Sequence, residues 1–490
     1  MQEYAGATTC VVFGAVQPEW RERLRGMRAM LWCATAREVA AGALPIEAER
    51  IQLCRLENVS AAEWSEALMR FVRLDARRLP SVFVASTEAS FVALTLAELR
   101  EQHRARVTRQ QDGFAWQRHV LANLPLYARR PLPLAWKDAL AGLPAAVCGA
   151  GPSLDVSAPR LAAGQAGCVV FAADSALRTL AKHGVRADFA VSIDVAKVPE
   201  KCLPESGELP GRVVLTAVSP PSWSARVGEE RIHFVSSRQI TTDLLARGGV
   251  PAPALAGAEN CGVSALELAR WLGCAPIYLF GLDLALSGTQ RHTGAVDASI
   301  YARSGFDATQ ACPEVPGNWT ETVPTHAPGD WRALNARLAI FPSGTVINVN
   351  DRGARFENAP AVLPADWIAP GPIAAGAKAE RLAALAAGAP DDAAASERAI
   401  AGAFADLRAS GQRVRAALPA ARSALATRGP DGAAAALRPL LADVAVGRAL
   451  GGFALKAMPH LLPPTEGDAD FWRGLIDECE QLAGALEAVR

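Results

Sequence analysis

Short, uniformly apolar runs bounded by turn residues recur through the middle of the sequence. They do not alternate with polar residues, which is typical of strands covered on both faces of a sheet. Helical patterns separate several of them, at 175–184 and 262–273. Strands that alternate with helices predict βαβ units, so we expect a doubly wound, mostly parallel α/β sheet. The runs lie at 144–149, 168–174, 187–194, 211–219, 231–237 and 275–283.

The flanking regions differ from this middle part in composition. A chain of 490 residues is longer than one core usually holds, so we expect several domains. Residues 1–130 mix strand-like runs with helical pattern and predict a small α/β domain. The prolines of 122–135 are expected to stop any helix there and to form a linker. Residues 131–365 would form the central domain, and the Ala-rich residues 366–490 predict a helical region.

Composition narrows the classes of partner. The chain has 50 basic and 50 acidic residues, and this balance argues against a nucleic-acid partner. We find no apolar run of about 18 residues, so no membrane span is expected, and the first residues lack the pattern of a signal peptide. The ten cysteines are scattered without zinc spacing, which favours a cytoplasmic protein with free thiols and no metal site.

A glycine turn follows the first of the central apolar runs. Gly149 and Gly151 would let the backbone approach a ligand closely, and Ser153 would cap the next helix or donate its hydroxyl. Backbone N–H groups at a helix start suit a phosphate. The turn departs from the dinucleotide fingerprint because Leu154 stands in place of the third glycine. A phosphate site and a tight structural turn both remain open here.

Three of the predicted strands end in aspartate. Asp174, followed by Ser175, ends one strand, and Asp194 and Asp283 end two others. A single aspartate at such a place is commonly a helix cap or a turn residue. Their repetition at the carboxyl edge of one sheet favours a polar ligand site, since open α/β sheets bind ligands there. A carboxylate at that edge could bind ribose hydroxyls, hold a metal or orient a base.

Two further segments add polar groups to this predicted edge. Gly262 and Ser264 begin the helical pattern at 262–273, and a helix start favours an anion. His292 lies in the polar loop 287–294 that follows Asp283. A histidine there could act as a general base, bind an anion or be an ordinary loop residue.

In combination these motifs resemble a known family. GAGPSLD, AADSALRTLAKHGVRADFAVSID and CGVSALELARWLGCAPIYLFGLDLALSGTQRHTGA resemble the motility accessory factor family, bacterial proteins implicated in flagellin glycosylation with nonulosonic sugars. The resemblance extends to WQRHVLANLP, VPGNWTETVPT and VINVNDRGARFENA. The same central domain is similar to archaeal 6-hydroxymethylpterin diphosphokinases and to a bacterial sialyltransferase class, which implies a Rossmann-like, sialyltransferase-like fold.

The resemblance implies a nucleotide pocket at the strand ends. His292 and Asp283 would lie nearest the transferred group as catalytic residues, and His326 is a further candidate. The residues expected to contact the nucleotide or to line its pocket are Gly149, Gly151, Ser153, Asp174, Ser175, Asp194, Gly262, Ser264 and Asn318.

The function implied is transfer of a nonulosonic sugar from a CMP donor to Ser or Thr of flagellin. This scheme needs a nucleotide-sugar donor and a protein acceptor, with no metal and no other cofactor. One alternative is an ATP- and Mg²⁺-dependent diphosphotransferase acting on a pterin-like alcohol. Another is a non-catalytic nucleotide-binding or assembly protein, because a fold does not fix a function.

Overall fold

The computed structural model describes residues 7–41, 51–72, 79–85, 89–236, 260–299, 312–387, 393–461, 465 and 467–490. The chain divides into two compact units, Met1–Gln111 and Asp112–Arg490. The boundaries expected at 130/131 and 365/366 stay predictions. None of the ten cysteines, all of which lie in the described ranges, forms a disulfide.

The first unit is a small α/β sandwich. Its strands are β1 (Thr9–Phe13), β2 (Ala29–Ala34), β3 (Ile51–Arg55) and β4 (Ser81–Val84). They pair in parallel in the order β3-β2-β1-β4. The accompanying helices are α1 (Arg21–Arg25), α2 (Ala36–Ala41), α3 (Ala61–Val72) and the start of α4 (Ala89–Arg129).

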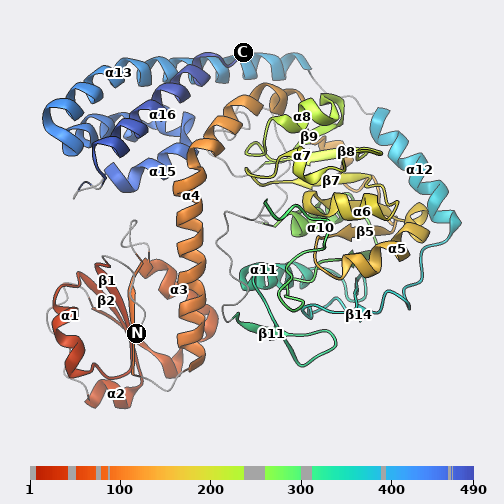
Figure 1. Ribbon diagram of the computed structural model, residues 1–490, viewed down its shortest axis with the longest axis horizontal. Coiled ribbons are helices and arrows are strands. Elements are labelled where there is room, and N and C mark those ends of the chain that lie inside the picture. Colours follow the sequence, from red (N-terminus) through yellow and green to blue (C-terminus); the bar gives the residue numbers. More distant parts are fainter. Residues whose placement is uncertain are drawn as a thin grey trace. The chain divides into compact units, whose positions relative to one another are not determined.

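The second unit is built on a parallel sheet, as the apolar runs predict. Within the described residues the sheet has eight strands in the order β14-β13-β10-β5-β6-β7-β8-β9. The paired strands run parallel (Figure 1). The strands are β5 (Ala145–Cys148), β6 (Val169–Ala173), β7 (Phe189–Ser192), β8 (Arg212–Leu215), β9 (Ile232–Phe234), β10 (Ile277–Phe280), β13 (Val346–Val349) and β14 (Ala361–Val362).

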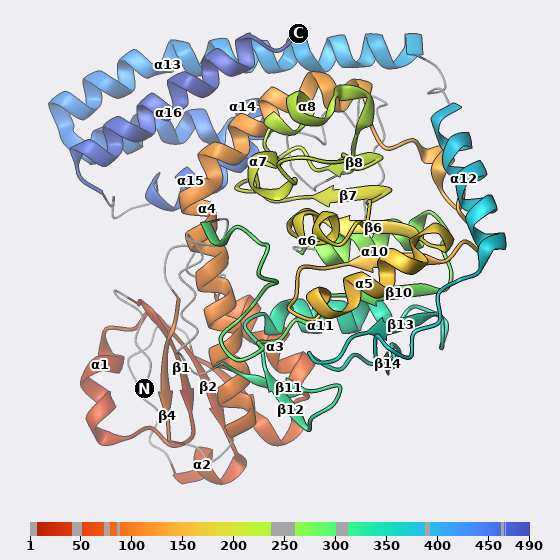
Figure 2. The ribbon, with the colours of Figure 1, turned by 45° about the vertical axis from the view of Figure 1, so that its right-hand side comes forward.

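Helices cover both faces of this sheet, so the doubly wound fold is confirmed. Successive side chains of a strand point to opposite faces. Cys148 therefore faces the core that contains Leu161, whereas Val147 faces the core that contains Leu266. Figure 2 shows α5 and α6 on the near face of the strands. The helices of this domain are α5 (Leu154–Gly164), α6 (Leu177–Lys182), α7 (Pro199–Cys202), α8 (Ser222–Val227), α10 (Cys261–Trp271) and α11 (Pro328–Leu338).

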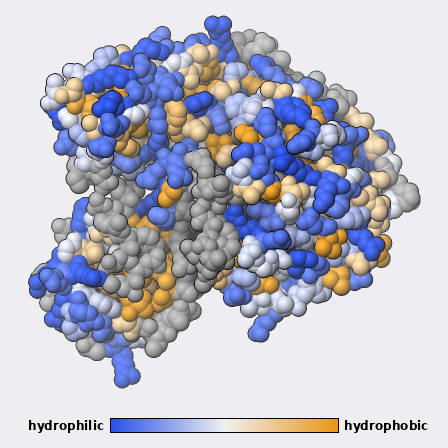
Figure 3. Space-filling view, in the orientation of Figure 1, coloured by the Kyte–Doolittle hydropathy of each residue, from blue (hydrophilic) through white to orange (hydrophobic). Residues whose placement is uncertain are grey.

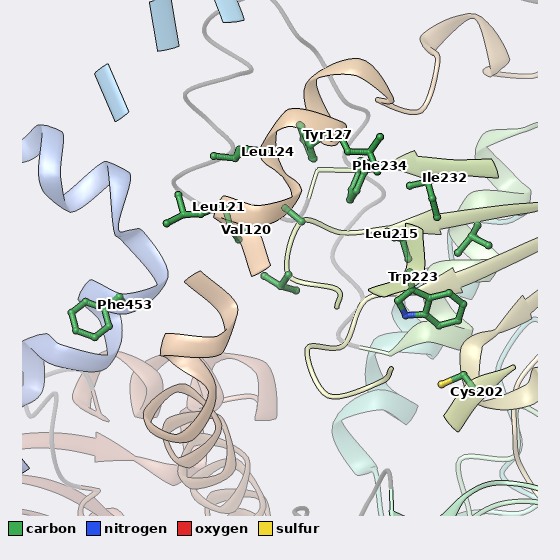
Figure 4. Packing of buried hydrophobic residues seen from close by; sticks show 14 of the residues in the cluster. Val120, Leu121, Leu124, Tyr127, Cys202, Leu215, Trp223, Ile232, Phe234 and Phe453 are labelled. Carbon is green, nitrogen blue, oxygen red and sulfur yellow. The ribbon is translucent and has the colours of Figure 1, made fainter. Parts of the chain in front are cut away.

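The expected helix stop at 122–135 is only partly right. α4 runs through Pro125 and ends at Arg129. A proline inside a helix removes one backbone hydrogen bond. Here the helix continues because its apolar side chains are buried, among them Leu124 and Tyr127, whose ring centroid lies 5.4 Å from that of Phe234 (Figure 4).

The region after the sheet is helical, as predicted. Its helices are α12 (Pro372–Ala387), α13 (Ala393–Ala442), α14 (Val444–Ala449), α15 (Gly451–Leu461) and α16 (Ala469–Glu487). α13 is kinked at Gly429, whose φ is 68°. Gln117 ties this region to α4, because its amide donates to the Ala449 carbonyl at 2.9 Å and accepts from Gly452 N at 2.9 Å.

Among the described helices none is long and apolar enough to cross a membrane. On the face shown in Figure 3, apolar residues lie scattered among hydrophilic ones over much of the surface.

Candidate functional site

The order of the strands changes direction between β5 and β10. From β5 the chain adds β6, β7, β8 and β9 on one side, and then returns through α10 to add β10 on the other side. The carboxyl ends of two neighbouring strands that diverge in this way form the crevice where open α/β sheets bind ligands. The glycine turn after β5 and Asp283 after β10 both lie at this switch point.

The glycine turn fits tightly against the segment after β10. A Cβ atom on Gly149 would lie 2.6 Å from the Gly281 carbonyl oxygen, and one on Gly151 would lie 2.6 Å from Cγ of Asp283. Gly281 has a φ of 61°, a backbone conformation that other residues rarely adopt. Only glycine allows the two backbones to approach this closely.

Asp283 holds Ser153 at the start of α5. Its carboxylate accepts hydrogen bonds from the Ser153 backbone N–H, at 2.8 Å, and from the Ser153 hydroxyl. The side chain is buried. Burial raises the pKa of Asp283 from 3.8 to about 6, and the two hydrogen bonds oppose that rise. Asp283, predicted to be catalytic, is thus hydrogen-bonded to Ser153, predicted to contact the nucleotide.

Asp174 is the centre of a second cluster, at the ends of β6 and β7. One carboxylate oxygen accepts from Lys197 Nζ at 3.0 Å, and the other accepts from the Ser192 hydroxyl at 2.8 Å. The Cys261 thiol, on the first residue of α10, also donates to Asp174 at 3.3 Å. Asp174 is fully buried, and Lys197 is nearly so. The cluster therefore joins three segments at the carboxyl edge of the sheet: the end of β6, the end of β7 with the loop that follows it, and the start of α10.

Three of the predicted site residues keep polar atoms available. In the part of the chain that the structure describes, the hydroxyls of Ser175 and Ser264 have no hydrogen-bond partner. Asp194 uses one carboxylate oxygen to accept from Ala196 N at 2.8 Å, and its other oxygen has no partner among the described residues. These atoms could bind a ligand without breaking a contact within the protein.

The start of α10 links the two clusters. Asn260 caps the helix by accepting from Gly262 N at 2.8 Å, while Cys261 reaches Asp174. A Cβ atom on Gly262 would collide with the side chain of Leu282, which precedes Asp283. The N-termini of α5 and α10 therefore lie at the same edge of the sheet, and both ends favour negative charge.

His292 lies beside the glycine turn. The next residue, Thr293, donates its backbone N–H to the Ala150 carbonyl at 3.0 Å. The ring centroid of His292 lies 6.1 Å from that of His326. Burial, together with the positive charges of neighbours such as Lys197, lowers the pKa of His292 from 6.5 to about 3. His292 is therefore neutral at neutral pH and can accept a proton.

Asn318 ties the β11–β12 hairpin to the segment after β13. The hairpin consists of β11 (Glu314–Pro316) and β12 (Thr322–Pro324). The Asn318 amide donates to the Asn350 side chain at 3.2 Å and to the Ala354 carbonyl at 2.9 Å. Ala354 also donates its backbone N–H to the Asp283 carbonyl at 2.9 Å. Asn318 therefore helps to hold the backbone segment that packs against Asp283.

Sequence reasoning missed two charged residues at this edge, Lys197 and Arg352. Lys197 follows Asp194 in a loop, and nothing in its sequence context distinguishes it from a surface lysine. Arg352 follows the strand Val346–Val349, and the strand-end criterion that selected the aspartates would have found it had that strand been recognised.

Two of the three strand-end carboxylates already bind protein donors. Both oxygens of Asp283 are occupied by Ser153, and both oxygens of Asp174 accept from side chains. In the part of the chain that the structure describes, no three or more His, Cys, Asp or Glu side chains lie together as a metal ion would need. At this edge the hydroxyls of Ser175 and Ser264 have no partner among the described residues, and hydroxyl donors suit an anion.

A protein-family model described as 6-hydroxymethylpterin diphosphokinase MptE-like matches residues 118–289. These residues form an MptE-like domain. The MptE-like domain contains the glycine turn, the Asp174 cluster, the start of α10 and Asp283. His292, Asn318 and Arg352 lie beyond its end.

One solved structure that resembles the chain is the MAf glycosyltransferase from Magnetospirillum magneticum AMB-1. The two chains are 17% identical and superpose with a TM-score of 0.53, over 99% of this chain and 79% of that one. The chain therefore has the fold of a MAf glycosyltransferase, as the resemblance to the motility accessory factor family predicts, and the family model supports the resemblance of residues 118–289 to the diphosphokinase-like proteins. No curated protein matches the sequence.

Proposed function

We propose that this protein is a glycosyltransferase that moves a nonulosonic sugar from a CMP donor to a Ser or Thr hydroxyl of flagellin. The proposal is supported by the fold shared with a MAf glycosyltransferase over 99% of the chain. The observation that carries it is the pairing of two helix N-termini with the unpartnered hydroxyls of Ser175 and Ser264 at the switch point of the sheet. The phosphate of a nucleoside monophosphate such as CMP is bound by hydrogen-bond donors of this kind.

In this reaction the acceptor oxygen forms a bond to the anomeric carbon. The bond between that carbon and the phosphate oxygen breaks, and CMP leaves with the electron pair. The helix N-termini of α5 and α10 stabilise the charge on the leaving phosphate. His292, neutral at neutral pH, takes the proton from the acceptor hydroxyl. An anionic phosphate nearby raises the pKa of His292 and makes it a stronger base.

Asp283 acts here through Ser153. It keeps the Ser153 N–H and hydroxyl at the start of α5, and so positions the turn that meets the phosphate. The unpartnered oxygen of Asp194 accepts a hydrogen bond from a ribose hydroxyl. The helices after the sheet contact the protein acceptor.

The test is a transfer assay with flagellin and a CMP-linked nonulosonic acid, read as the mass gain of flagellin. His292→Gln should reduce the rate by about 100-fold or more, since a general base typically contributes at least that factor. His103→Gln, on the exposed surface of α4, is the matched control and should retain wild-type activity. Wild-type activity in His292→Gln would remove His292 from the mechanism, and no transfer by the wild type would defeat the proposal.

The second candidate is a diphosphotransferase acting from ATP on a pterin-like alcohol. It is favoured by the family model that matches residues 118–289. The carboxylates of Asp174 and Asp283, however, are occupied by protein donors rather than grouped around a metal position.

Ligand-induced stabilisation separates these candidates from a non-catalytic protein. A ligand at 100 times its dissociation constant raises the free energy of unfolding by about 2.7 kcal/mol. We expect CMP to stabilise the wild type and ATP with Mg²⁺ not to do so. The reverse result would support the diphosphotransferase. Stabilisation by CMP without transfer would support a binding protein.

A further inference from the structure

Arg352 lies beside the glycine turn, on the β13 side of the switch point. Its backbone neighbour Gly353 packs against Asp283, since a Cβ atom on Gly353 would lie 3.0 Å from the Asp283 Cα. Its guanidinium donates to the Ser287 hydroxyl at 3.1 Å, in the loop that follows β10. Arg352 thus connects the segment after β13 with the loop after β10.

The guanidinium is fixed in place but keeps donors to spare. Nε and Nη2 donate to the two carboxylate oxygens of Asp351, at 2.9 Å and 2.6 Å, and Nη1 donates to Ser287. An arginine has five N–H donors, so two of them have no partner in the described part of the chain. The side chain is 38% exposed. Because hydrogen bonds already fix the guanidinium, its side chain loses little conformational entropy when the remaining N–H groups bind an anion.

Two carboxylates near the start of α5 act on the charge of Arg352. The pKa of its guanidinium is raised, first by the hydrogen bond to Asp351, and also by the charges of Asp283 and Asp155. Asp283 holds Ser153, which precedes α5, and Asp155 is the second residue of that helix. Arg352 therefore lies within electrostatic reach of the turn that we assign to the phosphate.

We propose that Arg352 recognises the carboxylate of the transferred sugar. This inference rests on the proposed function, because nonulosonic sugars carry a carboxylate beside the anomeric carbon. Two N–H groups of one guanidinium match the two oxygens of a carboxylate. The match would make Arg352 the residue that selects acidic sugars.

The carboxylate fits this position better than the phosphate does. The groups assigned to the nucleotide, Ser175, Asp194 and Ser264, lie at the ends of β6 and β7 and on α10. Arg352 follows β13, on the other side of β5 and β10. A donor laid across the switch point, with its phosphate at α5, would place its sugar toward Arg352.

The test measures the affinities of CMP and of CMP-linked N-acetylneuraminic acid for the wild type and for Arg352→Gln. We expect the variant to bind CMP within about twofold of the wild type. Its affinity for the sugar-linked donor should fall by about 10- to 100-fold, the loss typical of a hydrogen bond to a charged group. Arg352→Lys should lose most of that affinity as well, because a lysine cannot bind both oxygens of a carboxylate in one plane.

The methyl ester of the same donor removes the negative charge from the sugar. The wild type and Arg352→Gln should bind this ester equally. Arg415→Gln is the matched control, because Arg415 also donates to both oxygens of a carboxylate, that of Glu487, in the C-terminal helices. This variant should bind both ligands as the wild type does.

The binding measurements test the role of Arg352 separately from the proposed glycosyltransferase function. Equal losses for CMP and for the donor would assign Arg352 to the phosphate and overturn the inference. No loss for either ligand would overturn it too, while leaving the proposed function intact. If the wild type binds neither ligand, the proposed function fails and the inference fails with it.

Discussion

Asp283 and Ser153 are 130 residues apart in the sequence, yet they share two hydrogen bonds at the switch point of the sheet. Through them the segment after β10 determines where the first turn of α5 lies. The contact accounts for the glycine at position 151, because a larger residue would occupy the space of the Asp283 carboxylate. The pH dependence of stability and the effect of a side chain at position 151 both depend on this packing.

The first prediction concerns pH. Burial raises the pKa of Asp283 from 3.8 to about 6. The folded state therefore holds this proton more tightly than the unfolded state does. The resulting stabilisation is fully present below pH 3.8 and is lost as the pH rises through about 6. A shift of about two units corresponds to about 3 kcal/mol.

The measurement is chemical unfolding of the wild type and Asp283→Asn across this pH range. Between about pH 4 and about pH 7, the free energy of unfolding of the wild type should fall by about 2–3 kcal/mol relative to the variant. Parallel pH profiles for the two proteins would contradict the assignment.

The second prediction concerns the glycine turn. In Gly151→Ala the new methyl group would lie 2.6 Å from Asp283 Cγ and 2.8 Å from the Gly281 carbonyl oxygen. We expect a loss of about 1–3 kcal/mol of stability, as for other overpacked sites, together with weaker CMP binding. Gly474→Ala is the control, because this glycine lies in α16 with nothing within 4 Å of a Cβ atom. It should be neutral or stabilising by up to about 1 kcal/mol. Equal effects of the two substitutions would show that the turn tolerates a side chain.

The third prediction concerns the buried ion pair. Lys197→Met would leave the carboxylate of Asp174 buried without its cation, and we expect a loss of about 3–5 kcal/mol. Adding Asp174→Asn to this variant should restore part of that stability, because the second change removes the uncompensated charge. The double-mutant cycle, measured by chemical unfolding, gives the coupling free energy. Additive losses would mean that the two residues act independently.

The fourth prediction concerns the available hydroxyls. Ser264→Ala should weaken CMP binding by about 2- to 10-fold, the value of one hydrogen bond, with little change in stability, since this hydroxyl has no partner among the described residues. Ser157→Ala is the control, because the Ser157 hydroxyl donates to the Ser153 carbonyl within α5. Titration calorimetry should find its CMP affinity unchanged. A loss of stability without a loss of affinity in Ser264→Ala would make this serine a structural residue.

Much of the fold could be predicted from local pattern. The six apolar runs between 144 and 283 became β5 to β10, and the helical pattern at 262–273 became α10. Such runs are informative because strands covered on both faces exclude polar residues. The helix through Pro125 was missed, because its continuation depends on side chains such as Leu124 and Tyr127 packing in the core.

The sequence by itself determined that glycine, serine and aspartate would gather at one edge of a parallel sheet, because every strand end in such a sheet faces the same way. It left open which of these side chains support one another and which are available to a ligand. That division was decided by tertiary structure alone, through contacts such as those of Asp283 with Ser153 and of Asp174 with Lys197. The reason is physical: a side chain's hydrogen-bond partners depend on which segments meet across the sheet, and that meeting has no local signal in the chain.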